Sequence, residues 1–140
     1  MKSQQMKVVS EFRKNSRVHL SDIARKMGIP KTTLYGHYRE AKKCIRQCTT
    51  LIDFAKLGYS LRINFIFRIK NNKIINNFLL KQANVNSVYK VNNKNTVCIE
   101  CYFRSMAEAY AFKEKLEGRG IKRIDIRYII EEHKKEGFLR

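Results

Sequence analysis

The chain has 140 residues, and its 30 Lys and Arg against 12 Asp and Glu give a net charge of +18. A hydrophobic content of 44% is enough for a packed core and argues against a disordered chain. A field of this sign attracts polyanions, which favours nucleic acid over an anionic membrane as partner, with a merely solvated basic surface as the alternative. Because we find no apolar run long enough for a signal peptide or a membrane span, we expect a cytoplasmic protein with reduced cysteines.

Residues 1–53 have the pattern of three helices, of which the last two are tightly joined. The first is predicted over residues 4–14, and Ser21 is expected to be the N-cap of the second. Gly28 ends the second helix, and Pro30 stands near the start of the third. In the third helix a packing face recurs at helical spacing, formed by Leu34, Tyr38, Ala41 and Ile45. Two helices joined within about three residues cross steeply, so this part is predicted to be a (winged) helix-turn-helix.

The remaining sequence alternates between strand and helix patterns. Strict alternation in "LRINFIFRIK" predicts a half-buried strand, and "SMAEAYAFKEKLEGRG" opens with the capping box of Ser105 and Glu108. The expected order is strand 61–70, helix 72–82, strands 87–91 and 96–103, helix 105–118 and strand 121–130. This order is the ferredoxin-like βαββαβ unit. The fold class is therefore predicted as α+β, with a helix-turn-helix domain at 1–53, including a connecting strand "IRQCTTLI", and a ferredoxin-like domain at 54–140.

Several motifs in this order resemble the Lrp/AsnC (feast/famine) family of transcription regulators, of the archaeal type. They are "LSDIARKMGI", "KTTLYGHYR", "LIDFAKLGYSL" and "VNSVYKV", and together they cover nearly the whole chain. The resemblance implies an N-terminal helix-turn-helix, and a C-terminal ferredoxin-like domain that builds dimers and often binds a small effector.

The chain departs from the family pattern at the turn where members often contribute to an amino-acid effector site. The family's Thr-Gly followed by Asp is replaced here by Asn92, Asn93, Lys94 and Asn95. There are three further departures. Pro30 stands where members commonly carry Ser or Thr, and Phe54 stands where they carry Pro. A glycine that members have near the position of Cys44 is missing here. We therefore expect free amino acids to bind weakly or not at all at the usual site, and the effector-binding residues stay unassigned.

The third predicted helix supplies the candidate DNA-binding site. The major groove admits one α-helix, and residues near the N-terminus of that helix meet the base edges. A glycine inside the helix costs roughly 1 kcal/mol relative to Ala, so Gly36 indicates either a close approach of DNA or a tolerated weak point. The residues expected at or near the base edges are Lys31, Thr32, Tyr35 and Gly36, and Thr33 is also expected to contact DNA. Those expected at phosphates are Arg17, Arg25, Arg39, Lys42 and Lys43.

Metal binding and catalysis have little support in the sequence. "CIRQC" and "CIEC" suggest a four-thiolate zinc site, but "CIEC" lies in an alternating strand, so Cys98 and Cys101 point to opposite faces. The three histidines lie far apart in the sequence and have no obvious catalytic partner. We expect no metal, no cofactor and no enzyme activity. A tetrapyrrole-related enzyme remains a distant alternative, because sirohaem decarboxylases resemble the chain in layout.

The sheet face opposite the predicted core mixes both signs of charge with apolar groups. Its members on three strands include Arg62, Asn64, Ile66, Arg68, Glu100, Tyr102, Asp125, Arg127 and Ile129. A plain solvated face is one interpretation. The resemblance implies the other, in which two subunits face each other here in a homodimer or higher oligomer. The leading hypothesis is a sequence-specific, dimeric DNA-binding regulator that binds double-stranded DNA, and the alternative is an architectural DNA-binding protein with little sequence preference.

Overall fold

The computed structural model describes residues 3–135 and 137–138, which belong to two compact units. One unit combines residues 1–51 with 133–140, and the other comprises residues 52–132. Each has its own hydrophobic core. The predicted division into domains at 1–53 and 54–140 stays a prediction.

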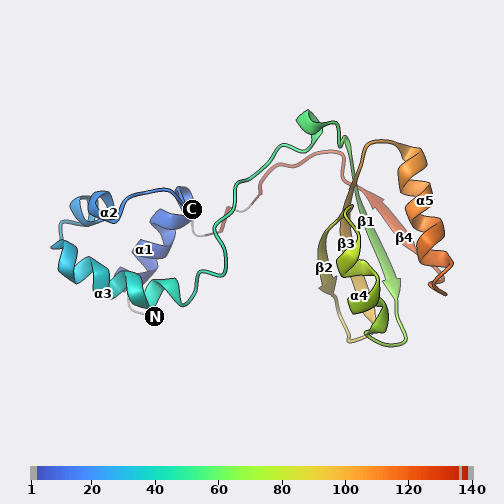
Figure 1. Cartoon of the computed structure of the whole chain (residues 1–140), viewed down its shortest axis with the longest axis horizontal. Coiled ribbons are helices and arrows are strands. Elements are labelled where there is room, and N and C mark those ends of the chain that lie inside the picture. Colours follow the sequence, from blue (N-terminus) through green and yellow to red (C-terminus); the bar gives the residue numbers. More distant parts are fainter. Residues whose placement is uncertain (1–2, 136, 139–140) are drawn as a thin grey trace. The chain divides into compact units, whose positions relative to one another are not determined.

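The first unit contains helices α1 (Ser3–Lys14), α2 (Leu20–Met27) and α3 (Lys31–Lys42) (Figure 1). Its core consists of small and aliphatic side chains from all three helices, namely Val8, Ile23, Ala24, Leu34 and Ala41. Phe12 and Tyr38 border this core, with their ring centroids 5.4 Å apart. The end of the chain also belongs to this unit, where Arg13 Nε donates a hydrogen bond to the carbonyl oxygen of Phe138 at 3.2 Å.

Three details of this unit differ from the sequence prediction. The second helix begins at Leu20, so its N-cap is His19 and not Ser21. The third helix ends at Lys42, which leaves Ile45 half-buried beyond it. The expected connecting strand is absent, because residues 45–53 have no regular structure. A strand needs a hydrogen-bonding partner, and the described part of the first unit contains neither that partner nor a wing.

The second unit is a four-stranded antiparallel sheet in the order β2-β3-β1-β4. Its strands are β1 (Leu61–Arg68), β2 (Val85–Lys90), β3 (Thr96–Phe103) and β4 (Asp125–Tyr128). Short 3-10 turns occupy Ala55–Leu57 (η1) and Leu79–Lys81 (η2). Helices α4 (Lys73–Asn77) and α5 (Met106–Glu117) follow β1 and β3, which completes the predicted βαββαβ order. The predicted α+β fold class is thereby confirmed.

One face of the sheet carries the larger core. Alternate residues of β1 and β3 are buried there, including Phe65 and Phe103, and both rings pack against Phe112 of α5. The predicted capping box exists: Ser105 Oγ accepts from the backbone N–H of Glu108 at 3.3 Å, which fixes the start of α5. The alternate side chains of the same strands point to the opposite face of the sheet. The described helices α4 and α5 pack on the core side instead, so we call the opposite face the open face.

Two elements depart most from their predicted bounds. The helix expected at 72–82 is split into α4 and the following 3-10 turn, and the strand expected at 121–130 is paired only over residues 125–128. Gly120 and Arg123 adopt positive φ angles of 81° and 55°, so an extended strand cannot start before them. None of the described helices has the length and apolar character required to cross a bilayer.

The cysteines of β3 lie as the alternation predicted. Cys101 is fully buried in the core and Cys98 is half-buried on the other face. Burial raises the pKa of Cys101 to about 12, which keeps this thiol protonated at neutral pH. Among the described residues, no group of three or more His, Cys, Asp and Glu side chains is close enough to hold a metal ion.

Candidate nucleic-acid interface

The turn between α2 and α3 is built around a glycine in the left-handed conformation. Gly28 has a φ of 64°, and its backbone N–H bonds to the carbonyl of Arg25 at 3.2 Å. The next N–H, of Ile29, bonds back to Ala24 at 3.1 Å, so the last carbonyls of α2 are satisfied within the turn. Pro30 then precedes the first residue of α3. This sequence of conformations changes the direction of the chain within a few residues and leaves the first residues of α3 exposed.

Helix α3 has a buried side and an exposed side. Leu34 and Ala41 are fully buried, and Tyr38 borders them. At 100° per residue, a continuous exposed arc of about 140° contains most of the predicted residues, namely Lys31, Thr32, Tyr35, Gly36, Arg39, Lys42 and Lys43. Thr33 is exposed as well, but it lies roughly 130° from the middle of that arc. We name the arc, without Thr33, the α3 arc.

Acidic side chains neutralise some of the basic residues around this arc. Lys43 Nζ lies 2.8 Å from Glu40 Oε1, and Arg25 Nη2 lies 2.7 Å from Asp22 Oδ1. By contrast, four of the predicted residues form no ion pair among the described residues, namely Arg17, Lys31, Arg39 and Lys42. The structure therefore separates basic groups that are available to an external anion from groups that already have a partner.

A further acidic residue joins the first two helices. Glu11 accepts from Lys26 at 2.6 Å and from Lys14 at 3.2 Å, which links α1 to α2. The hydrogen bond from Lys26 is the main cause that holds the pKa of Glu11 below its ordinary value. Glu11 is therefore ionised at neutral pH, and its ion pair with Lys26 joins α1 to α2.

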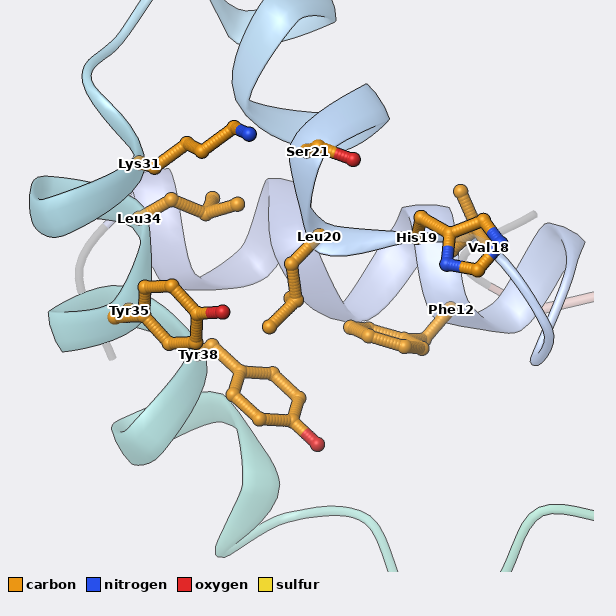
Figure 2. Close-up of a pocket in the computed structure, with 9 residues that line it drawn as sticks. All are labelled: Phe12, Val18, His19, Leu20, Ser21, Lys31, Leu34, Tyr35 and Tyr38. Carbon is orange, nitrogen blue, oxygen red and sulfur yellow. The ribbon is translucent and has the colours of Figure 1, made fainter.

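A hollow of about 440 Å³ opens beside the N-terminal half of α3. Figure 2 shows the side chains around it, with the Lys31 side chain directed toward Ser21 and the Tyr35 ring facing Leu20. Its apolar wall is formed by Phe12, Val18, Leu20 and Leu34. Its polar groups are the side chains of His19, Ser21, Lys31, Tyr35 and Tyr38. The hollow thus combines an ammonium group, two phenols, a hydroxyl and an imidazole over an apolar base.

The sequence prediction missed three polar members of this hollow. Ser21 was assigned to a cap, Tyr38 to packing and His19 to no role, whereas all three line the hollow. The periodicity of the helices contained no signal for the hollow, because it forms only where the 15–19 turn and the start of α2 lie beside α3. Of the predicted phosphate contacts, Arg17 lies in that turn and Arg25 on α2, and both are exposed.

Two arginines on the open face of the sheet, Arg62 and Arg127, are paired with carboxylates of the same chain. Arg62 Nη2 lies 2.6 Å from Glu100 Oε2 and also forms an ion pair with Glu132, while Arg127 Nη2 lies 2.9 Å from Asp125 Oδ2. All three carboxylates therefore bind arginines of their own chain. One polar group on the face is unsatisfied: the buried Oδ1 of Asn64 has no hydrogen-bond partner among the described residues.

Comparison with known proteins identifies the fold. No protein-family model and no curated protein sequence matches the chain. The structure of LrpC from B. subtilis aligns with a TM-score of 0.85 and 17% identity, over 96% of this chain and 97% of that chain. An AsnC family transcriptional regulator from Agrobacterium tumefaciens aligns with a TM-score of 0.83 and 16% identity, over 96% and 94% of the two chains.

A third solved structure is a transcriptional regulator from Neisseria meningitidis in complex with L-Met. It aligns with a TM-score of 0.80 and 12% identity, over 96% of this chain and 93% of that chain. At these identities the likeness establishes the fold. The chain has the fold of these Lrp and AsnC-type proteins over nearly its whole length, as the resemblance of its motifs implied.

Proposed function

We propose that the protein is a sequence-specific DNA-binding transcriptional regulator that acts as a homodimer or a higher oligomer. The observation that carries the proposal is the α3 arc, which places Lys31, Thr32 and Tyr35 near the exposed start of a helix held by a tight turn. A helix of this kind fits the major groove, where lysine donates to guanine and threonine or tyrosine contacts a thymine methyl. The shared fold with regulators supports the same function.

In this proposal the hollow beside α3 receives the sugar-phosphate edge next to the groove. The hydroxyl groups of Ser21 and Tyr38 in the hollow are donors suited to phosphate oxygens, and they lie beside Lys31 and Tyr35, which are assigned to base edges. Arg39 and Lys42 follow Tyr35 along the α3 arc and have no intramolecular ion pair among the described residues, so they suit the next phosphates. Base contacts would give specificity, and the phosphate contacts would give most of the affinity.

Selection of bound sequences from a random duplex pool tests the function. The selected duplex and a scrambled duplex of equal length and composition are then compared at two salt concentrations. A regulator should bind the selected duplex about 10³-fold or more tightly than the scrambled one at physiological salt. Equal affinity for both duplexes, with a steep salt dependence, would contradict sequence specificity and favour the architectural alternative.

The dimer is proposed to form through the open face of the sheet. Ile66 is half-buried in the middle of that face and offers an apolar group that a facing subunit would cover. Sedimentation of the full chain should give a dimer or larger species, and Ile66→Lys should shift it toward monomer. Lys115→Gln on the exposed side of α5 is the control. A monomeric parent at tens of micromolar would contradict the facing-sheet arrangement.

We also propose that free amino acids bind weakly or not at all at the β2–β3 turn. The turn consists of Asn92, Asn93, Lys94 and Asn95, so it offers no carboxylate for an ammonium group and no glycine for close approach. In addition, Asn93 Oδ1 is occupied by the backbone N–H groups of Asn95 and Thr96, each at 2.9 Å. Calorimetric titration with the twenty amino acids should give no micromolar response, and a clear micromolar response would contradict this.

A further inference from the structure

We propose that the second unit carries its own binding surface for the phosphate backbone of duplex DNA, at the end of the sheet where β1 and β2 terminate. The surface consists of Arg68, Lys70, Lys73, Lys90 and Lys94, and we name it the sheet-end cluster. It goes beyond recognition by α3, although it rests on the proposed binding of DNA.

The sequence of this region has charge of one sign only. From Ile63 to Ile99 the chain contains six basic residues and no acidic residue. Five of the six are the cluster members, and the sixth is Lys81. Elsewhere in the chain acidic residues are interspersed among the basic ones. A run of this length without a carboxylate leaves no local counter-charge for its lysines.

The fold brings these separate positions to one edge. Figure 1 shows β1 and β2 ending at the same side of the sheet, where the loop into α4 and the β2–β3 turn also lie. The backbone N–H of Ile69 bonds to the carbonyl of Asn95 at 2.7 Å, which places Lys70 next to the turn that carries Lys94. Lys90 Nζ donates to Asn72 Oδ1 at 2.6 Å, which connects the end of β2 to the start of α4.

All five members of the sheet-end cluster are exposed. Among the described residues, none of the five forms an ion pair. Five cations without counter-charge at one edge repel one another, so a polyanion that binds there gains both attraction and relief of this repulsion. The charge pattern thus points to a ligand with repeated negative charges.

The loops that carry the cluster are held by asparagine side chains. Asn93 Oδ1 accepts three hydrogen bonds, from the N–H groups of Asn95 and Thr96 and from the Thr96 hydroxyl at 3.1 Å. Asn71 Oδ1 accepts from the N–H of Lys73 at 3.0 Å. The lysines therefore project from ordered turns, which lowers the entropy lost when they contact phosphates.

Duplex DNA is the polyanion that fits best. Lysine and asparagine side chains are donors suited to phosphate and sugar oxygens, and contacts to the DNA backbone read no base sequence. Single-stranded nucleic acid is bound instead by successive aromatic platforms between basic residues, whereas beside Lys90 the described residues offer a single exposed ring, Tyr89. Since α3 is proposed to bind a duplex, the sheet-end cluster would contact a further part of that duplex or a second segment.

Two matched triple variants of the full chain test this surface. Lys70→Gln, Lys73→Gln and Lys94→Gln remove three charges from the cluster. Lys81→Gln, Lys115→Gln and Lys122→Gln remove three exposed charges elsewhere in the same unit and serve as the control. Affinity for a duplex several helical turns long is measured over a range of salt concentrations by fluorescence anisotropy. The cluster triple should lower the log–log salt slope by about 0.9 per lost contact, and the control should leave it unchanged.

Lysine acetylation, read by mass spectrometry, gives a second and independent measurement. DNA should protect Lys70, Lys73 and Lys94 of the parent chain from acetylation and leave Lys115 and Lys122 reactive. Equal salt slopes for the two triples, or equal protection of both sets of lysines, would overturn the proposal. A loss confined to single-stranded RNA, with duplex binding unchanged, would also overturn it. The function proposed for α3 is tested separately, by the base preference. If Thr32→Ala loses that preference and the cluster triple keeps it, the function of α3 stands whether or not the sheet-end cluster binds DNA.

Discussion

The two units present their positive charge in different ways. In the first unit, Glu11, Asp22 and Glu40 lie among the basic residues and pair with several of them. At the sheet end of the second unit, the described residues offer the lysines no such partner. The acidic residues of the first unit leave only some of its cations without an ion pair among the described residues, and Lys31, Arg39 and Lys42 of the α3 arc belong to these. The total charge of +18 does not reveal this difference. Only the ion pairs within the chain show which cations are available to an external anion.

The largest expected effect comes from the start of α3. Replacing Lys31, Thr32 or Tyr35 with Ala should weaken binding to the selected duplex by about 1–3 kcal/mol and relax the preference at one base position. Thr33→Ala is the matched control for Thr32→Ala, since Thr33 lies off the α3 arc. Competition titrations with single-base variants of the duplex measure both quantities. If Thr32→Ala and Tyr35→Ala bound every sequence like the parent, α3 would not be the recognition helix.

A smaller effect should separate two neighbouring lysines. Lys42→Gln should reduce the log–log salt slope by about one unit on selected and scrambled duplexes alike, because phosphate contacts are independent of sequence. Lys43→Gln should reduce it less, since Glu40 already engages that ammonium at 2.8 Å. Glu40→Gln should raise the slope by freeing Lys43. Equal slopes for the Lys42 and Lys43 variants would show that intramolecular pairing does not select the DNA-facing cations.

The smallest expected effect concerns Gly36. A Cβ at this position would meet no atom within 4 Å, so alanine fits and should raise the stability of α3 by up to about 1 kcal/mol. If the DNA backbone approaches here, the same methyl group should weaken DNA binding several-fold. Thermal unfolding measures the first effect and anisotropy the second. A more stable variant with unchanged DNA affinity would mean that Gly36 is a tolerated weak point in the helix.

Much of the fold follows from local patterns in the sequence. The alternation of β1 and β3 gave their inward faces correctly, and Leu34 and Ala41 lie in the core as their helical spacing predicted. The features that could not be predicted depend on residues distant in sequence. His19 replaces Ser21 as the cap because the preceding turn sets where α2 begins, and β4 is short because pairing with β1 decides its length.

The predicted DNA-binding residues are exposed as expected, but exposure alone does not rank them. Lys42 and Lys43 are adjacent and identical in type, and only the position of Glu40 distinguishes them. Likewise, Arg62 and Glu100 are separated by 38 residues, so their pairing within one chain appears only once β1 and β3 are in register. Sequence patterns indicate which face a side chain occupies, whereas its partner depends on the assembled fold.

The hydrogen bond from Arg13 to Phe138 joins positions 125 residues apart, near the two ends of the chain. The ribosome releases α1 well before the segment after residue 132, so the first unit cannot make all of its contacts until that segment has been synthesised. The sheet of the second unit has all its strands before that point. A chain truncated at residue 132 would therefore lose part of the first unit, while its sheet would be complete.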